Sequence, residues 1–349
     1  ALRRRGPRRR RLAYVVIGFM LLVIAGILIA AVSIKFVFPH RELIVRVDDV
    51  EYTRGDLVKL LQAKQKQFEL VGGSFKSGRE VFEALQALIE TEMIAQVAPD
   101  YGVTASDEEV DAEIRRIFMP NVGSAQVDAR QIEREFEDRY GSFLNEIQLT
   151  NSQFRAEIRK QILRERFKQH IGESVPTVAP QARVHRIVLS PQDELELIRE
   201  KFVDMLDGRT DPRVIRAAFK ALVREHSRDD AEIVRLGGDL GWGPKGVFKE
   251  YDDLIFSLEV GKLSFQTPNF NDPQQLYVFL VSEKDEARAV DPVNLDRLKT
   301  AALQDWLNDE RANHDVFAEL NSDIYAWLLN QLRLTTTITP SPAPNPLGF

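Results

Sequence analysis

An uncharged segment of 23 residues, Leu12 to Ile34, limits what the N-terminal part of this chain can become. A helix of that length spans roughly 30 Å, the thickness of the hydrocarbon core of a bilayer. Residues 1–11 before it carry seven arginines and no acidic residue. Because cationic flanks stay on the cytoplasmic side, we predict a single-pass signal anchor over residues 12–39 in the cell membrane. The bulk of the chain is then extracytoplasmic.

A cleaved secretory signal is the alternative for this segment. The apolar part of such a signal is only about 7–15 residues long and ends in a small-residue cleavage site. Here the apolar stretch is longer and runs into KFVFPHRE without a clear site of that kind. The sequence therefore favours an uncleaved anchor.

Charge and composition exclude several classes of function. The arginine arm contributes +7 to a net charge of −6, so the remaining 338 residues carry −13. With the apolar segment next to it, the arm predicts membrane topology and contact with lipid through residues 12–34, not nucleic-acid binding. The chain has no cysteine and five scattered histidines, so we expect no metal site and no cofactor.

Helical patterns dominate residues 40–174. Residues 42–61 alternate around Asp48 and predict a short hairpin, followed by a helix from about Thr53. Ser106 and Glu109 have the spacing of a capping box at the start of a helix. Further apolar periodicities predict helices over 79–102, 106–118, 129–140 and 150–171.

The composition changes at residues 172–181, which contain two prolines and a glycine and mark a domain boundary. Residues 182–286 predict a mixed α/β domain, with strands at 182–189 and 276–283. Residues 291–334 return to helix, including a long one over 294–316. The tail 335–349 has four prolines and no charged side chain, and is predicted to be disordered. The fold class is α+β.

The segment LGGDLGWGPKG, residues 236–246, contains a formal G-x-G-x-x-G. A dinucleotide site needs a buried strand before the first glycine and an acidic residue about 20 positions after the last. Neither is present, since the preceding segment RDDAEIVRLGG is no buried strand and the residue 20 positions after Gly246 is Gln266. Pro244 also interrupts the motif. We therefore read the segment as a glycine loop without a phosphate.

The stretch HSRDDAEIVRLGGDLGWGPKGVFKEYDDLIFSLEVGKLS resembles the parvulin-type peptidyl-prolyl isomerases. The order and spacing of its anchors match that family across residues 183–284 as far as Ser264. The flanking segments, such as LIETEMIAQVAPDYGVTASDEEVDAEI, look like the helical module of SurA-type chaperones and their membrane-anchored relatives. The likeness covers about residues 42–316 and implies that the C-terminal helix packs back on the helical module.

The resemblance also implies a site. The proline pocket falls on Leu240, Phe248 and Tyr251, and the polar group beside the reacting amide falls on Asp229. His185 matches the first family histidine and is implied to belong to a hydrogen-bond network under the pocket. Tyr277 stands where the family has its second histidine, so we expect the isomerase activity to be weak or vestigial.

Three functions follow from this resemblance. The first is a membrane-anchored folding factor that binds unfolded or nascent secreted and membrane polypeptides. The second is a true prolyl isomerase, and the third is a non-catalytic accessory subunit of a larger membrane complex. We expect the first.

Overall fold

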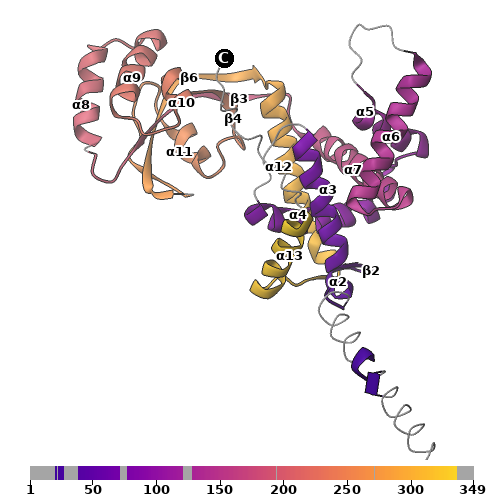
Figure 1. Ribbon diagram of the computed structural model, residues 1–349. Helices are drawn as coiled ribbons and strands as arrows, with labels where there is room; N and C mark the ends of the chain where they lie inside the picture. The colour runs from indigo at the N-terminus through magenta and orange to yellow at the C-terminus, as the bar shows by residue number, and fades with distance from the viewer. Residues whose placement is uncertain are drawn as a thin grey trace, which may run out of the picture. The chain divides into compact units, whose positions relative to one another are not determined.

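The computed structural model describes residues 20, 21, 23–26, 38–70, 77–120, 128–193, 195–270 and 272–335 (Figure 1). Most of the predicted anchor at 12–39 and nearly all of the tail at 335–349 lie outside these residues. No helix within the described ranges is both long enough and apolar enough to cross a bilayer.

The chain divides into two compact units. One comprises Ala1–Phe167 with Leu307–Phe349, and the other Lys168–Trp306. The division falls within two helices, α7 and α12.

The first unit is a helical module with one small sheet. The predicted hairpin forms, with β1 and β2 antiparallel, and β7 completes the sheet in the order β2-β1-β7. Its elements are α2 Phe38–Arg41, β1 Leu43–Val47, β2 Val50–Thr53, α3 Arg54–Leu70, α4 Ser77–Val97, the 3-10 turn Ala98–Tyr101, α5 Asp107–Phe118, α6 Ala129–Ile147, α7 Asn151–Ile171, the end of α12 Pro292–Glu310, the 3-10 turn Arg311–Asn313, β7 Val316–Ala318 and α13 Ser322–Thr335.

Local sequence signals explain several of these boundaries. Ser106 and Glu109 form the predicted capping box at the start of α5. Gly102 ends the turn after α4 with a φ of 71°, a conformation that favours glycine. The apolar faces of α5, α6 and α7 meet in a core built around Ile114, Phe136 and Ile158.

The helix predicted over 294–316 is shorter than expected, because α12 ends at Glu310 and residues 316–318 form a strand. The carboxylate of Asp48 accepts hydrogen bonds from His314 Nδ1 at 2.5 Å and from the backbone N–H of Asp315 at 2.8 Å. Arg46 adds an ion pair to Asp315 at 2.8 Å. These contacts draw the chain into extended pairing with β1, a long-range effect that helical periodicity cannot reveal.

The C-terminal residues of this unit also pack on its helices. α13 contacts α3 and α4. The hydroxyl of Tyr325 donates to the carbonyl of Gly78 at 3.0 Å.

The second unit is built on an antiparallel sheet in the order β4-β3-β6-β5. The segment expected to be a glycine loop is a strand in part, since residues 239–244 pair with β3. The elements are the 3-10 turn Gly172–Ser174, β3 Val178–Leu189, α8 Leu195–Leu206, α9 Pro212–His226, α10 Ala231–Leu236, β4 Asp239–Pro244, the 3-10 turn Lys249–Tyr251, α11 Asp252–Ser257, β5 Thr267–Asn269, β6 Asp272–Ala289 and the start of α12.

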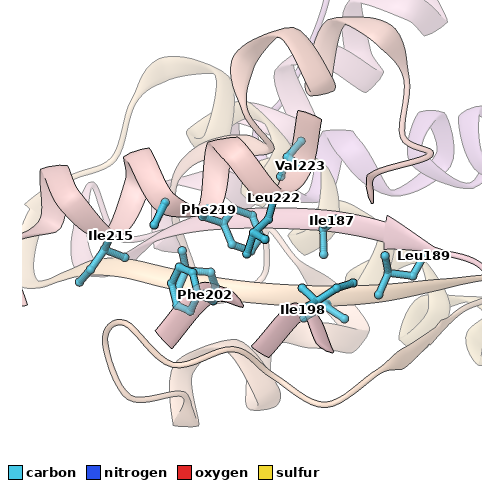
Figure 2. Packing of buried hydrophobic residues seen from close by; sticks show 11 residues of the cluster. Ile187, Leu189, Ile198, Phe202, Ile215, Phe219, Leu222 and Val223 are labelled. Carbon is cyan, nitrogen blue, oxygen red and sulfur yellow. The ribbon is translucent and has the colours of Figure 1, made fainter. Parts of the chain in front are cut away.

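The two faces of this sheet carry separate cores. On one face, Ile187 and Leu189 of β3 pack against Ile198 and Phe202 of α8 and Phe219 of α9 (Figure 2). On the other face, the buried side chains are Ala182, Val184, Ile255, Phe279 and Val281. The half-buried side chains packed against them are Leu240, Phe248, Tyr251, Leu254, Phe256, Leu258 and Tyr277. We call the first the helix face and the second the aromatic face.

The capping box gives a direct test of the helical module. Replacing Ser106 with alanine removes the acceptor for the Glu109 backbone N–H at the start of α5. We expect the free energy of unfolding to fall by about 1 kcal/mol, measured by urea denaturation. Ser152→Ala, at an exposed position in α7, is the matched control. Equal losses in the two variants would contradict the capping assignment.

Candidate functional site

Neighbouring residues of β3 point to opposite faces of the sheet. His185 pairs with Leu280, which belongs to the core of the helix face. Arg186 pairs with Phe279, which belongs to the aromatic face. Since side chains alternate along a strand, the structure places His185 on the side away from Tyr277.

The implied pocket residues do come together. Leu240, Phe248, Tyr251 and Tyr277 all lie on the aromatic face. The ring of Tyr251 lies 5.6 Å from that of Tyr277 and 5.0 Å from that of Phe279, measured between centroids. These spacings are those of favourable aromatic pairs. The result is an apolar surface assembled from β4, β6 and the turn before α11.

Arg186 joins this surface to Asp229. Its Nε and Nη2 atoms donate to the two carboxylate oxygens of Asp229, each at 2.8 Å. The guanidinium carbon also lies 4.5 Å from the ring centroid of Tyr277, within range of a cation–π contact. The Asp229 side chain is only 5% exposed. The carboxylate is therefore used to hold Arg186 against Tyr277.

Two hydrogen-bond donors remain at the edge of the surface. Within the described part of the chain, neither Nη1 of Arg186 nor the hydroxyl of Tyr277 has a hydrogen-bond partner. Burial raises the pKa of Tyr277 above its ordinary value, which favours the protonated phenol. Both groups can donate to a carbonyl oxygen of a bound polypeptide.

His185 has a different environment. It is 2% exposed, and its Nε2 lies 2.9 Å from the hydroxyl oxygen of Ser282. Its Nδ1 lies 3.8 Å from Asp239, which is itself paired with Arg183 at 2.7 Å. Burial lowers the pKa of His185 from 6.5 to about 4, with the Asp239 carboxylate opposing the shift. The imidazole is therefore neutral and part of the core.

Two glycines, one in β4 and one directly before it, allow close packing of the backbone. A Cβ at Gly243 would lie 2.8 Å from ring atoms of Phe248, closer than real side chains approach. At Gly238 the φ is 76°, and a Cβ would lie 2.3 Å from the carbonyl oxygen of Arg186. These two glycines serve close packing and a left-handed turn.

Arg186 is the residue that sequence reasoning missed. The resemblance drew attention to the neighbouring histidine, but Arg186, one residue further along β3, is the one on the face of Tyr277. The signal was present, because the alternation of β3 puts every second residue on one face. To decide which residues of β3 lie on the face of Tyr277, however, one must know which core residues of β6 pair with them.

Comparisons with known proteins identify relatives of the helical module. Residues 8–168 match the family described as the SurA-like N-terminal domain. The chain is 34% identical over 79 residues to Chaperone SurA of Pseudoalteromonas atlantica, a match that covers 22% of this chain and 16% of the relative. The chain thus contains a SurA-like N-terminal domain, and the predicted resemblance of this part is confirmed.

Solved structures of PrsA foldases and SurA-like chaperones are among the structural neighbours. The peptidylprolyl isomerase PrsA of Bacillus anthracis is 16% identical, with a TM-score of 0.33, and the match covers 72% of this chain and 96% of that one. A SurA-like chaperone of Campylobacter jejuni is 15% identical, with a TM-score of 0.25, and the match covers 66% and 92%.

The buried imidazole predicts how stability depends on pH. Because the pKa of His185 is lowered from 6.5 to about 4 on folding, the unfolded chain binds a proton that the folded chain does not between these values. His185 should therefore destabilise the fold as the pH falls from 6.5 towards 4, by up to about 3 kcal/mol. Urea denaturation of the full chain at pH 7 and pH 5 measures the larger part of this loss, about 2 kcal/mol.

His185→Gln should show a smaller loss than the native chain over the same interval. Ser282→Ala is the matched control, because it removes the same hydrogen bond but keeps the imidazole, and it should retain the native pH dependence. An unchanged pH dependence in His185→Gln would show that the imidazole is not the titrating group.

Proposed function

We propose that this protein is a membrane-anchored, extracytoplasmic folding factor that binds unfolded or nascent secreted and membrane polypeptides. The observation that carries the proposal is the SurA-like N-terminal domain over residues 8–168. The chaperone named among the relatives and the foldases among the structural neighbours are consistent with this class. The 23-residue uncharged segment supports anchoring, with the N-terminus in the cytoplasm.

The proposal assigns parts of the chain to separate tasks. Residues 12–39 anchor it, residues 40–174 form the chaperone module, and residues 182–286 form the parvulin-like domain. The C-terminal helices at 291–334 complete the module. The contacts of α13 with α3 and α4 support this last assignment.

The parvulin-like domain would bind proline-containing segments on its aromatic face. Rotation about an X–Pro bond meets a barrier of roughly 18–20 kcal/mol and breaks no covalent bond, so it needs no nucleophile. What it needs is an apolar seat for the ring and donors that stabilise the twisted amide. Leu240, Phe248 and Tyr251 would supply the seat, and Tyr277 and Arg186 the donors.

Weak activity is the outcome that this geometry supports. Asp229 is committed to a bidentate pair with Arg186, so its carboxylate is not available to the reacting amide. Tyr277 offers one donor in place of an imidazole with two nitrogens. The second function that we considered, a fully active isomerase, therefore ranks below the folding factor.

Suppression of aggregation tests the proposed function. The full chain in lipid nanodiscs, added in equimolar amount to a chemically denatured client protein, should reduce light scattering on dilution. Empty nanodiscs are the control. A lack of effect at severalfold molar excess would contradict the folding-factor assignment, and an accessory-subunit role would then be favoured if a stoichiometric partner co-purifies.

The isomerase part of the proposal has a separate test. In a proline-peptide isomerisation assay on the full chain, Tyr277→Phe should lower the catalysed rate about tenfold or more, since it removes one donor to the twisted amide. Tyr277→His should raise the rate above that of the native chain. Tyr325→Phe, in the other unit, is the control.

A rate in Tyr277→Phe equal to the native rate would remove Tyr277 from the site. A native rate indistinguishable from the uncatalysed one would exclude isomerase activity without affecting the folding-factor assignment, which depends on the aggregation assay.

A further inference from the structure

The helical module contains a cavity of about 300 Å³ among α3, α4, α5, α6 and α7. This volume is at the lower end of the range for ligand pockets. The walls are mostly apolar, and they include Leu60, Leu88, Phe118, Phe143, Phe154 and Ile158. A cavity of this size and lining suits a single aliphatic or aromatic side chain.

The charges of two lysines in the cavity wall are balanced by ion pairs with neighbouring carboxylates. Lys160 lies 2.7 Å from the carboxylate of Glu92 and 2.5 Å from the hydroxyl of Tyr52, and Tyr52 also donates to Glu92. Burial alone would raise the pKa of Glu92, but the hydrogen bonds from Lys160 and Tyr52 lower it below its ordinary value. Lys64 is paired with Glu80 at 2.8 Å. Neither lysine therefore makes the cavity positive.

Glu157 is a carboxylate in the cavity wall that is not part of these ion pairs. Its side chain lines the cavity from α7 and is half-buried, yet it has no hydrogen bond or ion pair with any described residue. Burial raises its pKa, with Lys160 opposing the shift and Glu92 and Asp56 adding to it. A half-buried carboxylate without a partner is costly, and a cation from a ligand would relieve that cost.

We propose that the cavity binds an extended polypeptide segment in which an apolar side chain fills the cavity and an adjacent lysine or arginine pairs with Glu157. The inference rests on the proposed folding-factor function, and it adds where a client is held and which sequences are preferred. Charge complementarity favours cationic segments at this site, because the Glu157 carboxylate would repel acidic segments or anionic headgroups.

A peptide-binding experiment tests this preference. The probes are three fluorescent peptides with the common sequence Gly-Ser-Leu-X-Phe-Ser-Gly, in which X is Arg, Gln or Glu. Fluorescence anisotropy with the full chain in nanodiscs measures their dissociation constants. We expect the Arg peptide to bind the native chain about tenfold more tightly than the Gln peptide, and the Glu peptide to bind most weakly.

Two variants and a matched control assign the preference to the cavity. Glu157→Gln should weaken binding of the Arg peptide about tenfold and change binding of the Gln peptide little, so that the preference disappears. Glu165→Gln, an exposed position on the same helix that does not line the cavity, is the matched control and should keep the preference. Ala87→Phe, which adds a ring at the cavity wall, should weaken all three peptides.

Equal affinities for the three peptides, or an Arg preference that survives in Glu157→Gln, would overturn the inference. Native affinities in Ala87→Phe, with the variant folded by circular dichroism, would also overturn it. If the aggregation assay succeeds while these peptides show no preference, only this inference fails. If aggregation is not suppressed but the Glu157-dependent preference is found, the cavity stands and the folding-factor function fails.

Discussion

The alternation of side chains along β3 is the constraint on which the second unit depends. β3 is an inner strand of the sheet, paired with β4 on one side and β6 on the other. Each residue is therefore committed to one of two cores. Ile187 and Leu189 fill the core under α8 and α9, and the intervening positions face the aromatic side chains of β6. A shift of register by one residue would exchange the two sets.

Because of this alternation, two adjacent residues of β3 have different roles, one in the core and one at the proposed binding surface. His185, neutral and bonded to Ser282, completes the core of the helix face. Arg186 crosses to the aromatic face, where Asp229 orients it and Tyr277 lies beneath its guanidinium. In the helical module a comparable arrangement occurs, since Lys160 pairs with Glu92, whereas Glu157, one turn away on α7, has no hydrogen bond or ion pair among the residues that the structure describes.

Local signals were sufficient for much of the fold. The apolar periodicity, the Ser106 capping box and the hairpin at Asp48 predicted helices and strands that the structure contains. Long-range pairing was not predictable in the same way. The strand Val316–Ala318 exists because Asp48 captures His314 and Asp315, and the glycine-rich segment became β4 because β3 offers it a partner.

The site was predicted only in part for the same reason. Leu240, Phe248, Tyr251 and Tyr277 share one face, as their motif positions implied. His185 lies on the other face, and Arg186 could be chosen in its place only once the register with β6 was known. The cavity at Glu157 could not be predicted from the sequence, because its walls come from five helices, β2 and the link between α6 and α7, whose packing no single periodicity describes.

Photo-crosslinking tests most directly the claim that clients bind one face of the sheet. A photoreactive phenylalanine analogue is placed at Phe270, whose ring lies 5.6 Å from that of Tyr251, or at Val203 on α8. The two positions are matched in exposure, at 65% and 64%. With a denatured, proline-containing client, we expect crosslinks from position 270 and few from position 203. Equal yields, or a greater yield from 203, would contradict it.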